Sequence, residues 1–533
     1  THLQTPETLL TMKDKTFSRS HDETASLLLN GEDGDALESS KIRASPAFSI
    51  FAAFFGILLV LLALNYAPIH STTSHMEFPQ DFVWGSATSS YQIEGALNEG
   101  GRGESIWEPF CDDPTNCNGD TAAVACDHYH RVESDVMLMK SLGMRAYRFS
   151  IAWPRIIPEG RGAVNPAGIA FYNLLIDTLL ENGIEPWITL HHWDLPQALQ
   201  DEYGGWLGRD IIDDFSAYAM VCYSMFGDRV KHWITINESW TIAINGYNNG
   251  VNAPGKAAHI ETDIYSVGHH LILAHARAVK IYRSTFKEKQ QGIIGVSHCA
   301  DFRYPRDNQS KSDHLAAQRA MVFQLGWFAD PIWKGDYPKE MRDILGDRLP
   351  IFSDEERSDI MASSDFLGLN HYSSLLATAV QEPPSFDGYW ADMLVSFSSN
   401  PQWKKNAMGW NIVPDGCRDM LKWIDERYGH PPIYMTENGS AFEENSLEEA
   451  LQDNDRQMYF EGYIRACGEA VDSGVDLRGY FAWSLMDNFE WQYGYKRRFG
   501  LCYVDFHSLE RTPKLSGNWY RDTIEANGGN IER

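Results

Sequence analysis

Residues 432–439 read Pro-Ile-Tyr-Met-Thr-Glu-Asn-Gly, a short apolar run that leads into a carboxylic acid, Glu437. Residues 231–238 read Lys-His-Trp-Ile-Thr-Ile-Asn-Glu and repeat the pattern, with Glu238 at the end. Each run has the length and the β-branched and aromatic content of a β-strand. Because strands this apolar are buried, we expect the acids at their ends to face a cleft rather than open water. Two carboxylic acids across one sugar ring are what glycoside hydrolysis requires, so the pair is a candidate catalytic site.

Six further strand-like runs alternate with amphipathic helical stretches along most of the chain. The eight expected strands are Asp81–Ala87, Ala146–Trp153, Ile184–Leu190, His232–Asn237, Gly292–Ser297, Asp365–Asn370, Pro432–Thr436 and Leu477–Leu485. The expected helices are Asp127–Leu142, Phe171–Leu180, Ile211–Met225, Val267–Tyr282, Leu315–Phe328, Arg418–Arg427 and Tyr459–Val471. Eight buried strands alternating with helices predict an α/β fold, a (β/α)8 TIM barrel with long loop insertions. A doubly wound sheet is the alternative, but no Gly-x-Gly-x-x-Gly follows the first strand, so the dinucleotide-binding version lacks its phosphate turn.

In such barrels the active site lies at the C-terminal ends of the strands, so the residues found there test the prediction. Nearly every expected end carries a group that can bind a hydroxyl or stack on a sugar ring. In chain order these are Gln92, Glu94, Arg148, Arg155, His192, Asp194, Asn237, Glu238, Asn370, Tyr372, Glu437, Trp483, Asn488, Glu490 and Trp491. Structural needs alone would not place such groups at so many matching ends. The end of the fifth strand, Ser297-His298, is uninformative.

The composition narrows the possible partners. A formal net charge of −28 argues against a nucleic-acid or anionic-membrane partner, whose phosphates need Lys and Arg. Cys111, Cys117 and Cys126 lie in one loop-like stretch, where one local disulfide is expected if the compartment is oxidising. No Cys-x-x-Cys pair occurs, which argues against a zinc or thioredoxin-like site.

The N-terminal segment differs from the rest of the chain. Residues 1–46 are polar and are expected to form a disordered cytosolic tail. Residues 47–64 carry no charge, and this run predicts a transmembrane signal anchor at 47–66, with a buried core helix as the alternative. Lys41 and Arg43 precede the run, so the positive-inside tendency predicts a type II protein with a lumenal or extracellular catalytic domain. Residues 67–76 are then a linker, and residues 77–533 form one catalytic domain.

Several longer stretches resemble glycoside hydrolase family 1, the β-glucosidase family. They are residues 82–95 (FVWGSATSSYQIEG), 126–131 (CDHYHR), 147–155 (YRFSIAWPR) and the two glutamate-containing runs. The resemblance spans residues 77–520. Matches this long, in this order, are highly specific.

The resemblance implies a role for each matching residue. Glu238 matches the acid/base and Glu437 the nucleophile. Residues that match those holding the nonreducing sugar are Gln92, His192, Asn237, Glu490 and Trp491, with Trp483 as the stacking platform. Arg148 and Tyr372 match groups that contact the nucleophile, and Asn370, two residues before Tyr372, is expected to support the site. His371 departs from the Tyr often found in the family, and we expect it to alter the rim of the sugar pocket.

The expected function is hydrolysis of terminal β-D-glucosyl residues with retention, by double displacement. This chemistry predicts a separation of about 5–5.5 Å between the two carboxyl groups. Arg148 would favour the charged form of Glu437, and that charge would raise the pKa of Glu238. No metal or cofactor is expected, and a carboxylate at Glu490 predicts an unphosphorylated sugar.

Two other readings of the same residues stay open. One is a transglycosidase of the same family, whose acceptor would be chosen by loops such as Thr378–Lys405. The other is a binding protein on a degenerate hydrolase scaffold, as in the klotho-like relatives, although that reading expects a glutamate to be lost. The sequence does not separate glucose from galactose or fucose.

Overall fold

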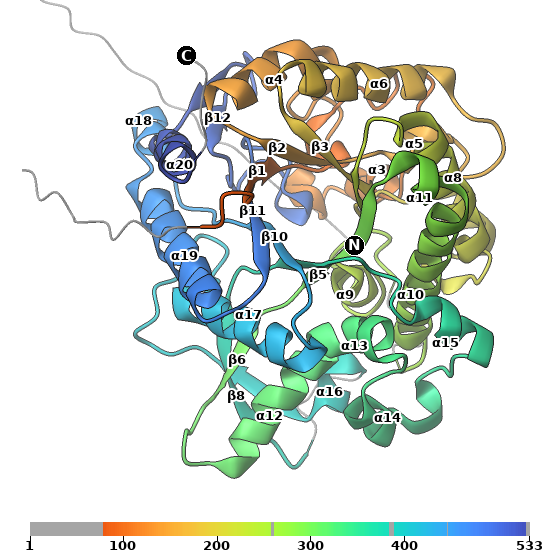
Figure 1. Cartoon of the computed structure of the whole chain (residues 1–533), viewed down its shortest axis with the longest axis vertical. Helices are drawn as coiled ribbons and strands as arrows, with labels where there is room; N and C mark the ends of the chain where they lie inside the picture. Colours follow the sequence, from red (N-terminus) through yellow and green to blue (C-terminus); the bar gives the residue numbers. More distant parts are fainter. Residues whose placement is uncertain (1–77, 257–260, 383–387, 445, 529–533) are drawn as a thin grey trace, which may run out of the picture. The chain divides into compact units, whose positions relative to one another are not determined.

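A closed barrel of eight parallel strands forms the centre of the protein (Figure 1). The computed structural model describes residues 78–256, 261–382, 388–444 and 446–528. Around the barrel the strands follow the order β1-β11-β10-β7-β5-β4-β3-β2. They are β1 (Val83–Ala87), β2 (Ala146–Ser150), β3 (Glu185–His191), β4 (His232–Asn237), β5 (Ile293–Cys299), β7 (Leu367–Asn370), β10 (Ile433–Asn438) and β11 (Leu477–Trp483). Each corresponds to one expected strand, so the predicted (β/α)8 barrel is confirmed.

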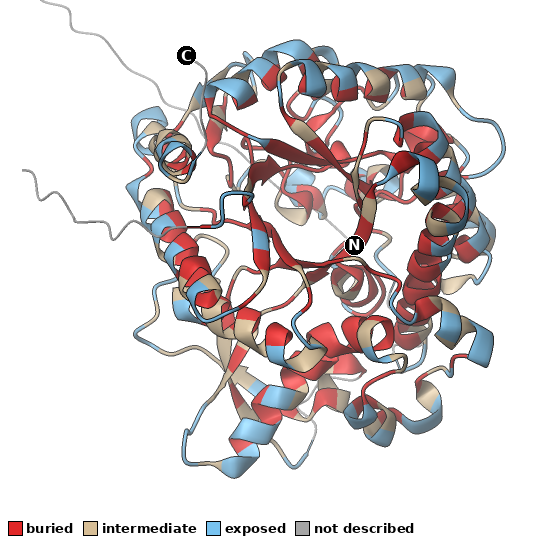
Figure 2. Ribbon diagram, in the orientation of Figure 1, coloured by how far each residue is buried: buried red, intermediate tan, exposed pale blue. Residues whose placement is uncertain are grey.

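Helices surround the barrel and bury the faces that they turn toward it (Figure 2). The longer helices are α4 (Val132–Ser141), α6 (Pro166–Glu181), α8 (Ile211–Phe226), α10 (Asp263–Ile281), α12 (Lys311–Met321), α13 (Trp327–Lys334), α17 (Pro414–Tyr428), α19 (Asn454–Asp472) and α20 (Leu515–Ala526). The shorter helices are α2 (Ser90–Ile93), α3 (Trp107–Asp112), α5 (Trp153–Ile156), α7 (Gln197–Tyr203), α9 (Ser239–Thr241), α11 (Lys287–Gln290), α14 (Lys339–Leu345), α15 (Asp354–Ile360), α16 (Tyr389–Met393) and α18 (Leu447–Leu451). All seven expected helices are present, and the stretch expected at Leu315–Phe328 is α12 and α13 joined by a π-helical turn.

Large side chains fill the interior of the barrel. The Trp187 ring stacks on His232 with ring centroids 3.9 Å apart and meets Tyr434 at 4.8 Å and Phe481 at 5.0 Å. Space there is short enough that a Cβ at Gly85 would come within 2.7 Å of the Phe481 ring. A filled barrel is a core and not a pore, so a ligand can enter only at an end.

The second expected strand ends earlier than predicted. β2 stops at Ser150, and Trp153 begins the short helix α5, with Pro154 in its first turn. Arg155 is buried and donates through Nε to Glu94 over 2.9 Å. Because this pair ties together the segments that follow β1 and β2, Glu94 and Arg155 hold the structure rather than line a cleft.

Two small sheets that the sequence did not predict lie outside the barrel. In the first, β6 (Phe302–Pro305) pairs in parallel with β8 (Ser374–Ala379), and β8 pairs with antiparallel β9 (Val395–Ser398). The second joins β12 (Cys502–Val504) to β13 (Arg511–Pro513). β6 and β8 begin shortly after β5 and β7 end, so the first sheet extends the barrel at the end where the site lies.

The cysteine-containing loop holds one disulfide, between Cys111 and Cys117. Cys126 is buried and free, and its thiol donates to the carbonyl oxygen of Asp487. The predicted tail and the predicted anchor at residues 47–66 lie outside the described residues. Across the ranges that are described, we find no helix long and apolar enough to cross a membrane.

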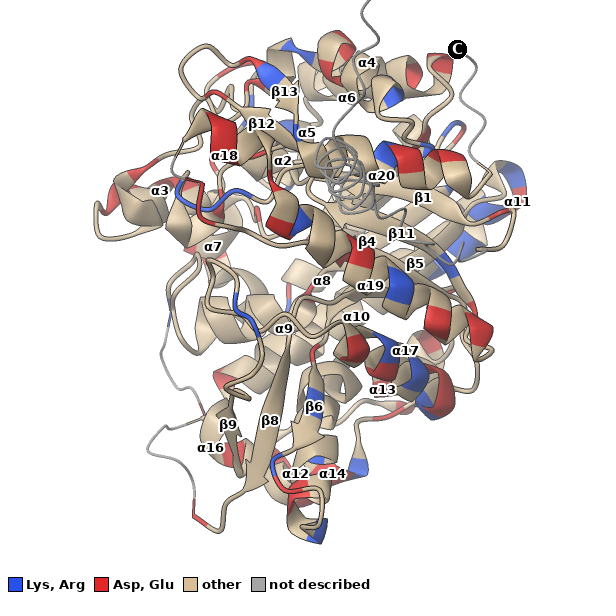
Figure 3. Cartoon of the chain, turned by 90° about the vertical axis from the view of Figure 1, so that its left-hand side faces the viewer, with Lys and Arg blue, Asp and Glu red and all other residues tan. Residues whose placement is uncertain are grey.

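Charged residues of both signs lie close together on the exposed faces of the outer helices. Figure 3 shows acidic and basic residues interleaved along α17 and α19. Arg418 of α17 pairs with Glu469 of α19, and Arg465 pairs with the same carboxylate. These two arginines are therefore engaged with an acidic neighbour and do not form a basic surface.

Candidate active site

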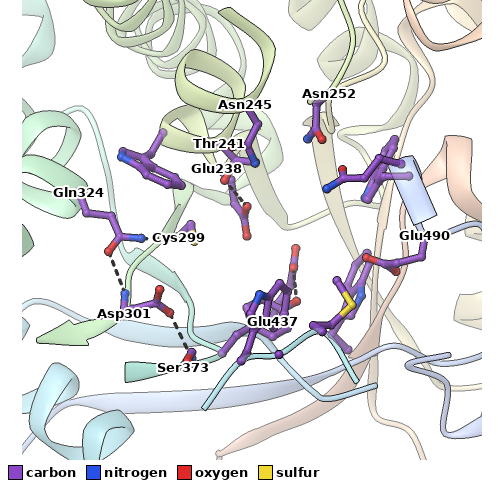
Figure 4. A pocket seen from close by; sticks show the side chains of 18 of the residues that line it. Glu238, Thr241, Asn245, Asn252, Cys299, Asp301, Gln324, Ser373, Glu437 and Glu490 are labelled. Carbon is purple, nitrogen blue, oxygen red and sulfur yellow. Dashed lines mark hydrogen bonds between the residues drawn. The ribbon is translucent and has the colours of Figure 1, made fainter. Parts of the chain in front are cut away.

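Glu238 and Glu437 enter one cavity at the C-terminal ends of their strands. Glu437 lies in β10, and Glu238 directly follows β4. Figure 4 shows the two side chains pointing into the cavity, Glu238 from above and Glu437 from below in that view. Both residues are buried, and both line a cavity of about 370 Å³. The central expectation from the sequence is therefore met by the geometry, although the predicted carboxyl separation stays a prediction.

Both oxygens of Glu437 accept strong hydrogen bonds. Arg148 donates through Nη1 to Oε1 over 2.6 Å, and the Tyr372 hydroxyl donates to Oε2 over 2.7 Å. Arg148 itself is fixed by bonds to the Thr436 carbonyl and the Asn237 side chain. Burial raises the pKa of Glu437, while the charge of Arg148 and the Tyr372 hydroxyl oppose that rise. These donors orient the carboxylate and favour its ionised form.

Glu238 receives two neutral donors instead. The Asn370 amide donates to Oε1 over 2.8 Å, and the Thr241 hydroxyl donates to Oε2 over 2.7 Å. The backbone of Glu238 is in the left-handed region (φ 53°), a strained conformation for a residue other than glycine. Burial, and next the charge of Glu437, raise the pKa of Glu238 to about 8. The sequence predicted the contribution of Glu437, but burial is the larger cause.

The residues expected to hold the sugar divide into two groups. His192, Tyr372, Trp483, Glu490 and Trp491 line the cavity, as do the two glutamates. Gln92, Arg148, Asn237 and Asn370 lie behind these side chains and hydrogen-bond to them. All eleven expected site residues therefore come together around one cavity.

Burial and nearby charges shift the pKa values of two of the lining residues, Glu490 and His192. Burial, and next the charge of Glu437, raise the pKa of Glu490 to about 8, although Gln92 donates to its carboxylate over 3.3 Å. Burial and the charge of Arg148 lower the pKa of His192 well below its usual range, so its ring is neutral. The Asn237 amide donates to Nε2 of His192, which leaves the ring proton on Nδ1.

The expectation for His371 is wrong. This side chain is fully buried and bonds through Nδ1 to the carbonyl oxygen of Ala300 over 2.9 Å. It lies outside the cavity lining and does not form the rim of the sugar pocket. A residue between two site residues on an extended segment points away from them, since side chains alternate along such a segment.

Ser297 and His298, the expected end of the fifth strand, do not line the cavity, but the residues just beyond them do. Cys299 ends β5, Asp301 follows it, and Arg303 lies in β6, while Gln324 joins them from the π-helical turn. Trp240, Trp390 and Trp410 line it as well. The only signal in the sequence was an acid and an arginine within a few residues of a strand end.

Thr241 was missed too, and its contact with Glu238 leads to a testable prediction. We expect Thr241→Val to move the alkaline limb of the kcat/KM profile upward by roughly 1 pH unit. The variant loses a donor that stabilises the ionised form of Glu238, and one pH unit corresponds to about 1.4 kcal/mol. The measurement is kcat/KM for an aryl β-D-glucoside from pH 4 to about pH 10.

Thr241→Ser keeps the hydroxyl and is the matched control, so its alkaline limb should stay where the native limb lies. The acid limb, which follows Glu437, should be the same in all three proteins. An unchanged alkaline limb in Thr241→Val, or equal displacement of both limbs, would contradict the assignment.

A closed (β/α)8 barrel has two buried carboxylic acids at its strand ends, one bonded to an arginine and a tyrosine and the other to an amide and an alcohol. This is the constellation of a glycoside hydrolase. A sequence model described as "Glycosyl hydrolase family 1" matches residues 74–529. The chain belongs to this family.

Similar proteins of known name support the assignment. Beta-glucosidase 42 of Arabidopsis thaliana is 46% identical over 485 residues, which are 89% of this chain and 98% of that protein. A crystal structure of the rice Os3BGlu6 beta-glucosidase is 46% identical, covers 83% of this chain and 98% of its own, and superposes with a TM-score of 0.81. A mutant of the same rice enzyme, 45% identical, is in a covalent complex with Glc. Together with the site, these relatives show that the chain is a retaining β-glucosidase.

Proposed function

We propose that Glu437 is the nucleophile and Glu238 the acid/base of a double displacement on terminal β-D-glucosyl residues. The observation that carries this assignment is the asymmetry of the donors. Glu437 is held by a guanidinium and a phenol, whereas the donors to Glu238 are an amide and an alcohol. Because one carboxylate beside another is hard to ionise, the proton goes to the acid without a cation, which is Glu238.

The first displacement forms a covalent intermediate. The Glu437 carboxylate attacks the anomeric carbon, the bond to the leaving oxygen breaks, and Glu238 gives that oxygen its proton. The sugar is then an ester of Glu437, so the negative charge that raised the pKa of Glu238 is gone. Covalent Glc on the related rice mutant supports an intermediate of this kind.

The second displacement releases glucose. Glu238, now ionised, takes a proton from water as the water oxygen attacks the anomeric carbon. The ester bond breaks, and Glu437 leaves as a carboxylate with Arg148 and Tyr372 again donating to it. Two inversions at one carbon give net retention.

The sugar is held by neutral and acidic groups. We assign His192 and Glu490 to its hydroxyls, and Trp483 and Trp491 to its faces. Asn237 and Gln92 orient His192 and Glu490 from behind. Glu490 offers no positive charge to a phosphate on the sugar, whether it is protonated or ionised, so the substrate is an unphosphorylated glucoside.

Retention is checked by following the first-formed product by proton NMR. β-D-glucose should appear first from an aryl β-D-glucoside and only then mutarotate to the α form. α-D-glucose as the first product would overturn the double displacement and assign an inverting mechanism. Transfer of the glucosyl group to an added alcohol faster than to water would favour the transglycosidase reading.

We further propose that residues 47–66 anchor the enzyme in a membrane as a type II protein, with the catalytic domain lumenal or extracellular. Eighteen uncharged residues after Lys41 and Arg43 support the proposal. The full chain, expressed in a eukaryotic host, should stay in the membrane pellet after a carbonate wash, with its β-glucosidase activity protected from protease until detergent is added. Activity in the carbonate supernatant would overturn the anchor.

A further inference from the structure

The sequence contains three acceptor motifs for N-linked glycosylation, which read Asn-x-Ser with x other than Pro. They are Asn237-Glu238-Ser239, Asn308-Gln309-Ser310 and Asn438-Gly439-Ser440. A glycan is bulky and strongly hydrated, so a folded protein can carry one only where the asparagine side chain reaches solvent. The structure separates the three motifs on this point.

The first motif belongs to the catalytic cavity. Asn237 is the last residue of β4 and is completely buried. Its amide donates to Nε2 of His192 over 3.0 Å, and its oxygen accepts from Arg148 over 2.7 Å. A glycan on the amide nitrogen would have to pass through the packed wall of the cavity, so a molecule modified there would lose the site.

The third motif is equally enclosed. Asn438 is the last residue of β10 and is completely buried. Its amide donates to the carbonyl oxygen of His371 over 2.5 Å and to the Tyr459 hydroxyl over 3.0 Å. A Cβ at Gly439 would collide with the carbonyl oxygen of Trp483, so the backbone around the motif has no spare room. A glycan at Asn438 is therefore incompatible with the folded barrel.

The second motif is open to solvent. Asn308 lies in the turn that joins β6 to α12, and residues 306–309 are all exposed. Figure 1 shows this turn at the outer edge of the molecule. The carbonyl oxygen of Asn308 accepts from His314 over 3.0 Å, but in the described part of the chain its side-chain amide makes no hydrogen bond. A glycan on this amide would displace no contact.

The turn is held by residues other than Asn308. The Asp307 carboxylate accepts from the backbone N–H of Gln309 over 2.9 Å, and the Asp307 carbonyl accepts from the N–H of Ser310 over 3.0 Å. The Ser310 hydroxyl accepts from the N–H of Asp313 over 3.2 Å and caps α12. Because these bonds do not involve the Asn308 side chain, the turn can keep its shape when that side chain is modified.

The disulfide between Cys111 and Cys117 supports the compartment that this modification requires. Disulfides form and persist in the lumen of the endoplasmic reticulum and outside the cell. N-linked glycans are added in the same lumen, so a chain that acquires the disulfide there also meets the glycan transferase.

We propose that Asn308 carries an N-linked glycan and that Asn237 and Asn438 carry none in the active enzyme. The inference rests on the proposed function in one respect, the lumenal or extracellular placement of the catalytic domain.

The transfer takes the sugar from a lipid-linked oligosaccharide. The amide nitrogen of Asn308 bonds to the anomeric carbon of the donor, and the bond from that carbon to the lipid pyrophosphate breaks. The pyrophosphate leaves with the electron pair, and the amide gives one proton to a base of the host transferase. A nascent chain exposes all three motifs, so folding decides which glycans a finished molecule keeps. A chain modified at Asn237 or Asn438 cannot complete the barrel and is lost from the active fraction.

The test follows each asparagine by mass spectrometry. The full chain is expressed in a eukaryotic host and extracted with detergent, and its active fraction is retained on an immobilised competitive inhibitor. Peptide N-glycosidase in heavy-oxygen water then turns a glycosylated asparagine into aspartate that carries the heavy isotope. We expect this label at position 308 and unlabelled asparagine at positions 237 and 438.

Two variants of the motif act as test and matched control. Asn308→Gln should lose the label and migrate on a gel like the deglycosylated native chain. Ser310→Thr keeps both the motif and the hydroxyl that caps α12, so it should keep the glycan. Both variants should match the native kcat/KM, because neither residue lines the cavity.

A new motif elsewhere on the surface tests the compartment separately. Ala362→Asn, made together with Asn308→Gln, completes a motif with Ser363 and Ser364. Ala362 is exposed, and its backbone is in the left-handed region (φ 58°), which asparagine adopts more readily than most residues. We expect position 362 to be glycosylated in this double variant.

The outcomes separate this proposal from the proposed placement. A glycan at position 362 of the double variant, but none at Asn308 of the native chain, would overturn the proposal and leave the placement standing. A glycan at Asn237 or Asn438 in the active fraction would overturn its second part. Absence of a glycan from both position 308 and position 362 would overturn the lumenal placement, and this proposal with it.

Discussion

Replacing Glu437 by alanine is expected to lower kcat for an aryl β-D-glucoside by about 10⁵- to 10⁶-fold, as the loss of a catalytic nucleophile does elsewhere. Within the described ranges, Glu437 is the carboxylate to which both Arg148 and Tyr372 donate. The measurement is kcat at saturating substrate, together with the melting temperature. Arg148 keeps its bonds to Thr436 and Asn237 in the variant, which limits the cost of leaving the guanidinium without its anion.

Rescue of Glu437→Ala by added azide tests whether the missing residue is the nucleophile. The shortened side chain leaves room for a small anion beside Arg148, and azide there attacks the anomeric carbon from the side that Glu437 used. Glu238 still protonates the leaving oxygen, so a single displacement yields the α-glucosyl azide. The control is Glu443→Ala, the same change at a carboxylate whose side chain is 66% exposed, and it should keep the native kcat. A β-glucosyl azide, or no rescue, would assign the nucleophile elsewhere.

The barrel could be predicted because its signal is local. Each barrel strand is buried on both faces, so each is a short apolar run that stands out from the helices around it. The filled interior then forces ligands to the strand ends, which is why Glu238 and Glu437 could be paired from their positions in the sequence alone. The start of α5 had a signal as well, since Pro154 is typical of a first helical turn, but the apolar residues before it extended the predicted strand.

The place of Asp301 and Arg303 in the cavity lining could not be predicted in the same way. It depends on β6 pairing with β8, which joins Phe302 to Ser374 across a long stretch of sequence. No local pattern records such a pairing. The pKa of Glu238 has one predictable cause and one that is not. The charge of Glu437 could be inferred from the two matching strand ends. Burial of the Glu238 carboxyl, the larger cause, depends on the whole cavity and leaves no local pattern in the sequence.

Replacing Glu238 by alanine is expected to give losses that depend on the leaving group. Cleavage of a glucoside with a poor leaving group, such as an alkyl glucoside, should lose about 10³- to 10⁴-fold in kcat/KM, because its oxygen needs the proton. A dinitrophenyl glucoside needs no proton, so its first displacement should stay near the native rate, and the glucosyl-enzyme should accumulate as a burst. The measurements are kcat/KM for both substrates and the burst of dinitrophenolate.

Azide distinguishes this variant from Glu437→Ala by the product that it forms. Glu437 is intact, so the first inversion still occurs, and azide then replaces water in the second displacement without needing a general base. The product is the β-glucosyl azide, the opposite anomer from that of Glu437→Ala.

The alkaline limb of kcat/KM near pH 8 should also disappear for the dinitrophenyl substrate, because the group that titrates there is gone. Glu238→Gln keeps the side-chain shape and should show the same dependence on the leaving group. Equal losses on both substrates, or the α-azide, would show that Glu238 does not carry the proton. Because the two variants differ only in which glutamate is removed, opposite anomers can arise only if the two residues act at opposite faces of the same anomeric carbon.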